Sequence, residues 1–150
     1  MINDQTLDSY PMMAITNLAM NPDGAVAAAS HVSKLLSALK SFDSSNLKSA
    51  LSTIIQITSE PKALALLTPE TINDIITTTR PFWDTENAKI IFKILDSIGV
   101  LEAGKEAIKN SDFPTYALNQ LKKVEITHAL RPMFLRIISR IDIDLSVLTF

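Results

Sequence analysis

The sequence contains no cysteine and few residues of the kinds that build reactive sites. Without cysteine the chain can form neither a disulfide nor a thiolate metal site. Its two histidines, His31 and His128, lie far apart on separate predicted helices, which gives no support to a histidine-based triad or a two-histidine metal site. Neither a Walker loop nor a dinucleotide-binding GxGxxG motif occurs. We therefore predict that the protein is not an enzyme and needs no cofactor or metal.

Glycine and long apolar runs are also scarce. Three glycines are too few for a sheet built from tight hairpins, whereas seven prolines suit the starts and breaks of many helices. No run approaches the roughly 18 apolar residues of a membrane span, and the first residues do not resemble a signal peptide. The net charge of −2 disfavours nucleic acid as a partner. We expect a cytoplasmic protein without a membrane partner, with the nucleus as the alternative location.

An apolar pattern recurs along the chain at steps of about forty residues. When Asn17 is matched to Gln56, Ser97 and Arg140, the spacings are 39, 41 and 43 residues. Spacings of this size are typical of armadillo and HEAT repeats, in which two or three helices form each unit. The pattern predicts an all-α fold with about three full repeats and partial units at both ends.

The predicted units cover residues 1–21 in part, 22–60, 61–101, 102–142 and 143–150 in part. Breaks between helices are expected at Asn21-Pro22 and Glu60-Pro61, and Thr68-Pro69 is expected to start a helix. Asp84 or Thr85 is expected to cap the third long helix, and Gly99 to end it in a left-handed conformation. The apolar segment 145–150 predicts a fragment of a longer protein, or else self-association through that end.

The first unit contains the segment Ala14-Ile15-Thr16-Asn17-Leu18-Ala19-Met20-Asn21-Pro22. It resembles the armadillo pattern of an alanine, a leucine or isoleucine, an asparagine-leucine pair and a following asparagine-proline. The resemblance implies a single solenoid domain over residues 1–150, a right-handed α-α superhelix whose third helices line a groove for peptides. In that family an asparagine on the third helix bonds the peptide backbone; Asn17 matches it and Gln56 offers a similar amide, whereas Ser97 and Arg140 depart from the pattern. A HEAT-like superhelix remains an alternative.

One face of the long helices carries most of the candidate binding residues. Residues four and eight positions before each aligned site lie on nearly the same side of a helix. Stacking these stripes yields a groove with basic residues and no acidic one. The predicted groove residues are Asn17, Lys48, Gln56, Lys89, Lys93, Arg136 and Arg140.

This groove predicts a scaffolding or regulatory module that binds a protein or peptide, favouring an acidic or phosphorylated segment. The simpler interpretation is that lysine and arginine form the solvated face of long helices. Two other functions stay open: a VHS-like or CTD-interacting type of peptide-binding domain and, from a different class, nucleic-acid binding along the basic face. Trp83 is expected either to fill a junction between repeats or to anchor a partner.

Overall fold

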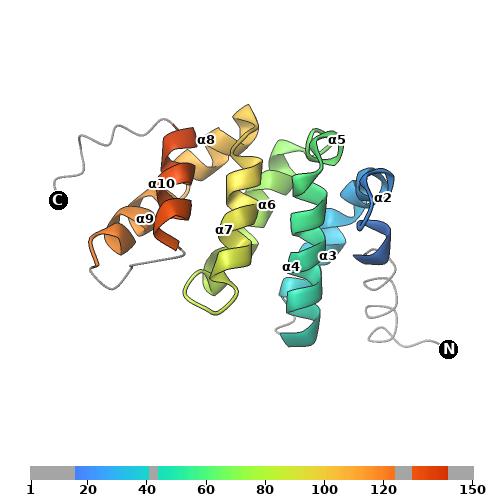
Figure 1. Cartoon of the computed structure of the whole chain (residues 1–150), viewed down its shortest axis with the longest axis horizontal. Coiled ribbons are helices and arrows are strands. Elements are labelled where there is room, and N and C mark those ends of the chain that lie inside the picture. Colours follow the sequence, from blue (N-terminus) through green and yellow to red (C-terminus); the bar gives the residue numbers. More distant parts are fainter. Residues whose placement is uncertain (1–15, 41–43, 124–129, 142–150) are drawn as a thin grey trace.

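A computed structural model describes residues 16–40, 44–123 and 130–141 (Figure 1). These residues form helices joined by short turns and contain no strand, so the all-α prediction is confirmed for this part of the chain. The predicted self-association through residues 145–150 lies outside the described residues.

The helices follow one another at short intervals, and their bounds are these: α2 Pro22–Ala28, η1 Ala29–His31, α3 Val32–Leu39, α4 Ser44–Ser59, α5 Pro61–Leu64, α6 Pro69–Thr79, η2 Arg80–Phe82, α7 Ala88–Ile98, α8 Glu102–Asn110, α9 Phe113–Leu121 and α10 Leu130–Arg140. Residues 16–18 form a helical turn before α2.

Local capping chemistry explains where several helices begin. The Asn21 side chain accepts a hydrogen bond of 2.7 Å from the Gly24 amide, and a proline follows it at the first position of α2. Thr68 caps α6 in the same way, through a bond of 3.2 Å from the Thr71 amide. A polar cap followed by proline satisfies one free amide and removes another. The break predicted at Asn21-Pro22 and the helix start predicted at Thr68-Pro69 are therefore confirmed.

The predicted left-handed end of the third long helix is wrong. Gly99 has φ −67° and ψ −8°, which any residue adopts. The chain leaves α7 through tight right-handed turns, because the Val100 amide bonds the Ser97 carbonyl at 3.3 Å and the Leu101 amide bonds the Ile98 carbonyl at 3.1 Å. No left-handed residue is needed for that exit.

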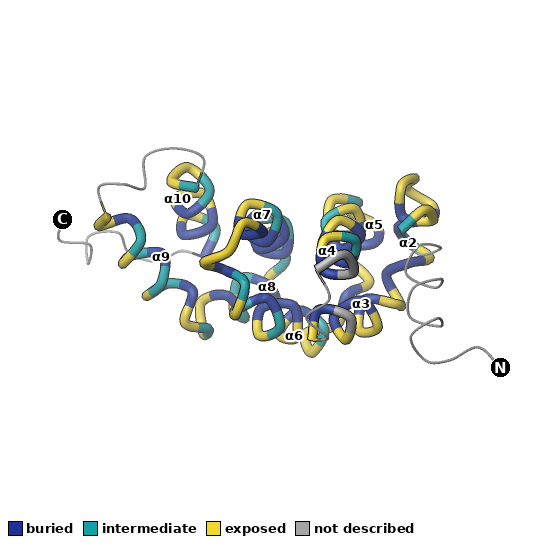
Figure 2. Tube along the Cα trace, turned by 90° about the horizontal axis from the view of Figure 1, so that it is seen from below, coloured by how far each residue is buried: buried dark blue, intermediate teal, exposed yellow. Residues whose placement is uncertain are grey.

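The helices lie in two layers (Figure 2). In one layer α4 packs against α7 and α7 against α10, and these three helices lie side by side (Figure 1). In the other layer α3 contacts α6 and α6 contacts α8, with α9 next along. Segments about forty residues apart are thus neighbours in space, as the apolar spacing predicts. The core between the layers includes the fully buried Ile54, Ile91 and Ile138 from successive long helices.

Aromatic rings fill the junction between η2, α7 and α9. Trp83 is only 1% exposed, and its ring centroid lies 5.1 Å from that of Tyr116, 5.5 Å from that of Phe113 and 6.1 Å from that of Phe92. Rings at these separations and tilted orientations attract one another and bury a large apolar area. Trp83 therefore packs at a junction between helices, as the first of its two expected roles requires.

Candidate functional site

Three pockets lie in series along the layer formed by α4, α7 and α10. The first lies between α2 and α4, the second between α4 and α7, and the third between α7 and α10. Ser59 lines both the first and the second, and Asp96 lines both the second and the third. Consecutive pockets share a lining residue and so lie next to one another, and we call the three together the groove.

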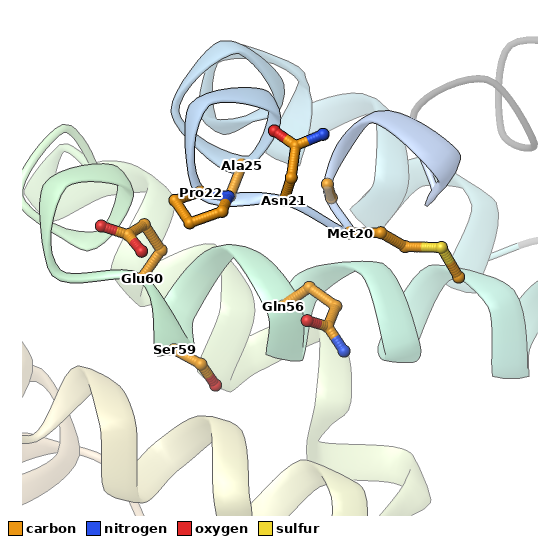
Figure 3. Close-up of a pocket in the computed structure, with 8 residues that line it drawn as sticks. Met20, Asn21, Pro22, Ala25, Gln56, Ser59 and Glu60 are labelled. Atoms are coloured by element: carbon orange, nitrogen blue, oxygen red, sulfur yellow. The ribbon is translucent and has the colours of Figure 1, made fainter.

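The first pocket, the amide pocket, has a volume of about 130 Å³ (Figure 3). Gln56 and Ser59 enter it from α4, and Met20 reaches toward α4 from the other side. The Asn21 amide is turned toward the start of α2, where it caps the helix. Of the two amide residues predicted for the groove, Gln56 lines this pocket. Asn17 is exposed on the helical turn at residues 16–18 and does not line it.

The second pocket, the central pocket, has a volume of about 380 Å³. Pro61 and Leu64 of α5 form one aliphatic wall, and Val100, which is 55% exposed, stands at another edge. Asp96, Ser97 and the predicted Arg140 line its polar side together with Thr58 and Ser59. This pocket can take an aliphatic side chain beside polar groups.

The third pocket, the basic pocket, has a volume of about 350 Å³. Three predicted groove residues meet here, because Lys89 and Lys93 lie one turn apart on α7 and Arg136 faces them from α10. Pro132 and Met133 provide the apolar part of the lining. The structure thus brings these three cationic side chains to the lining of one pocket.

Two acidic side chains line the groove, Glu60 in the amide pocket and Asp96 in the other two pockets. Asp96 Oδ1 accepts a bond of 2.6 Å from Arg140 Nε, and Asp96 Oδ2 lies 3.5 Å from Arg136 Nη1. The prediction that the groove has no acidic residue is therefore wrong. The predicted stripe on α7 contains Lys89, Lys93 and Ser97, so it leaves out Asp96, which precedes Ser97 by one position. The Asp96 side chain nevertheless contacts two arginines of α10. A short charge-assisted bond of this kind joins α7 to α10.

The two arginines differ in how firmly Asp96 holds them. The Arg140 side chain is 36% exposed and makes the short bond, whereas the Arg136 side chain is 62% exposed and makes the long one. An exposed ion pair as long as that of Arg136 contributes little to stability, because water competes for both partners. Arg140 is thus the arginine that Asp96 holds closely, whereas most of the Arg136 side chain is open to solvent.

Lys48, like Asn17, is a predicted groove residue that lies outside all three pockets. It is exposed near the start of α4. Its charge can still contribute to the field over the groove at low ionic strength.

A second polar cluster lies at the aromatic junction. The Arg80 guanidinium is 4.6 Å from the centroid of the Trp83 ring, and its Nε lies 2.6 Å from Asp112 Oδ2. The Tyr116 hydroxyl donates a bond of 2.7 Å to Asp84 Oδ1. Burial, followed by this bond to a carboxylate, raises the pKa of Tyr116 well above its ordinary value. These groups satisfy one another, so the cluster stabilises the junction.

Comparisons with protein-family models, with curated proteins and with solved structures find no match. Over the described ranges, no helix has the length and apolarity that crossing a bilayer requires. The same residues include no group of three or more histidine or acidic side chains placed to hold a metal ion.

Proposed function

We propose that this chain is a non-enzymatic protein-interaction module, an armadillo-type solenoid of about three repeats in a right-handed α-α superhelix. The armadillo-like segment at residues 14–22 supports it, as does the side-by-side packing of α4, α7 and α10, which repeats at the sequence spacing. Solenoids use such extended faces to bind other macromolecules. The module acts as a scaffold or adaptor, or regulates a longer protein, in the cytoplasm or nucleus.

The ligand is an extended peptide or a partner helix that lies along the groove. The observation that carries this proposal is the basic pocket, where Lys89, Lys93 and Arg136 converge in a chain whose net charge is −2. A local positive surface on a slightly acidic protein attracts acidic or phosphorylated segments and repels basic ones. Gln56 at the other end of the groove offers an amide that can bond a peptide backbone.

A charge-reversal experiment tests the proposal. The probe is a fluorescein-labelled twelve-residue peptide of glutamate, glycine and leucine, and anisotropy is measured at low ionic strength. The double variant K93E/R136E should bind it at least about tenfold more weakly, since two attractions become repulsions. The matched control is K34E/K109E, which reverses two exposed lysines of α3 and α8 that line none of the groove pockets.

Equal affinities of wild type and K93E/R136E would contradict the proposal. A single-stranded RNA of twelve nucleotides is titrated in parallel. If the RNA binds more tightly than the peptide, with a steep dependence on salt, nucleic-acid binding along the basic face is the better interpretation.

A further inference from the structure

We propose that the basic and central pockets act together as a two-part site for a phosphorylated peptide. The basic pocket takes a phosphoserine or phosphothreonine, and the central pocket takes an aliphatic side chain about two to four residues away. This inference rests on the proposed function and specifies the ligand class for the same groove.

The charges of the basic pocket favour phosphate over carboxylate. Its lining has three cationic side chains and one carboxylate, that of Asp96, which already bonds Arg140. A phosphate monoester carries a charge of about −1.5 to −2 and three acceptor oxygens, so it can engage Lys89, Lys93 and Arg136 together. A glutamate side chain has a single charge and two oxygens, and therefore leaves part of this positive charge unmatched.

The geometry around Asp96 allows one arginine to move while the other stays. Arg136 is the more exposed of the two and makes the longer contact to Asp96, 3.5 Å compared with 2.6 Å for Arg140. Transfer of Arg136 from Asp96 to a phosphate exchanges a weak pair for a bidentate one. Arg140 retains Asp96 at the boundary between the two pockets.

The central pocket supplies the second contact because it begins where the basic pocket ends. Both are lined by Asp96, and the central pocket has aliphatic walls from Pro61, Leu64 and Val100. An extended peptide advances about 3.3 Å per residue, so adjacent pockets of this size are spanned by a few residues. A leucine or valine at that distance from the phosphate buries apolar area that would otherwise stay in water.

The experiment compares four kinds of twelve-residue peptide in a glycine-serine background, and the three kinds that contain leucine are each made with spacings of two, three and four residues. One contains phosphoserine and leucine, one serine and leucine, one glutamate and leucine, and one phosphoserine and glycine. At the best spacing the first should bind at least about tenfold more tightly than the serine or glutamate peptide. Replacing leucine by glycine should cost about three- to tenfold.

Protein variants assign each contact to its pocket. K93A/R136A should remove the preference for phosphate and leave the effect of leucine, whereas V100S, which removes aliphatic surface without adding charge, should weaken binding of the leucine peptides alone. K34A/K109A is the control and should match wild type; circular dichroism verifies that each variant is folded.

The outcomes separate this inference from the function on which it rests. If the glutamate peptide binds as tightly as the phosphoserine peptide and both depend on Lys93 and Arg136, the groove binds acidic peptides and the phosphate preference is overturned. If leucine has no effect at any spacing, the two-part site is overturned. If no peptide binds in a way that depends on those residues, the proposed function fails as well.

Discussion

The carbonyl oxygen of Ile98 occupies the space in which a side chain on Gly104 would begin. A Cβ atom on Gly104 would lie 1.7 Å from that oxygen, and one on Gly24 would lie 1.6 Å from the carbonyl oxygen of Leu18. In both places the end of one helical segment meets the short helix that follows it. Packing therefore requires glycine at these two positions, which lie two predicted units apart.

Gly104→Ala should lower the free energy of unfolding by about 1–3 kcal/mol, because α8 must move away from the end of α7 to admit a methyl group. Urea denaturation followed by circular dichroism measures the change. Gly99→Ala is the matched control, since the nearest atoms to its Cβ would lie 3.3 to 3.4 Å away and its φ is ordinary. Equal losses for the two variants would contradict the close approach at Gly104.

The sequence predicts the starts of helices where the controlling contacts are local. Asn21 and Thr68 bond amides three residues further along the chain, so a cap followed by proline is enough to locate α2 and α6. The prediction that Asp84 or Thr85 caps α7 is less accurate, because that helix begins at Ala88. Thr85 instead serves a preceding turn, where its hydroxyl donates to the Phe82 carbonyl and accepts from the Asn87 amide.

The groove is only partly predictable from the sequence because its pockets depend on contacts between repeats. Helical spacing identifies the face that carries Lys89 and Lys93, and the repeat spacing brings Arg136 beside them. Neither spacing predicts how α7 and α10 are oriented when they pack, and this orientation brings Asp96 to Arg140, 44 positions further along the chain. A search for acidic residues about forty positions before each arginine would have found this pair.

Asp96→Asn should change stability and ligand binding in opposite directions. Loss of the negative charge weakens the bond that joins α10 to α7, which should lower the free energy of unfolding by about 1 kcal/mol. It also releases Arg136 and Arg140 and leaves the basic pocket more positive, so the acidic peptide should bind about three- to tenfold more tightly at low salt. Urea denaturation and fluorescence anisotropy measure the two effects.

The control for this variant is Asp112→Asn. Asp112 also pairs with an arginine at 2.6 Å, but it does so with Arg80 at the aromatic junction. That variant should leave peptide affinity unchanged. Weaker peptide binding by Asp96→Asn would show that Asp96 helps to hold the ligand rather than competing with it for the arginines.

Tyr116→Phe should lose its effect on stability as the solution becomes alkaline. At pH 8 the variant should be less stable than wild type by about 1 kcal/mol, because it lacks the bond to Asp84. Above the ordinary tyrosine pKa near 10, the unfolded chain releases the phenol proton while the folded protein keeps it. This proton release lowers the free energy of unfolding of wild type but not that of the variant. The difference between the two free energies should therefore shrink.

Urea denaturation of both proteins at pH 8 and near pH 11 measures this difference. Every other ionisable group is present in both proteins, so the comparison isolates the Tyr116 hydroxyl. A difference that stays constant over this interval would mean that the Tyr116 hydroxyl is not held in the protonated form by the fold.

Trp83→Phe distinguishes a structural role from a role in binding. Trp83 is buried among Phe92, Phe113 and Tyr116, and its indole Nε1 donates to Thr79 Oγ1 at 3.4 Å. The smaller ring leaves a cavity and removes this bond, so the free energy of unfolding should fall by about 1–3 kcal/mol. Because the residue does not line the groove pockets, affinity for the acidic peptide should not change.

The intrinsic fluorescence of wild type gives a second measurement, since Trp83 is the single tryptophan of the chain. Its emission should be blue-shifted, resistant to quenching by iodide and insensitive to the acidic peptide. A folded Trp83→Phe variant that bound the peptide at least about tenfold more weakly would instead support the anchor hypothesis. The junction would then have to open on binding, because Trp83 is too deeply buried to contact a ligand in this conformation.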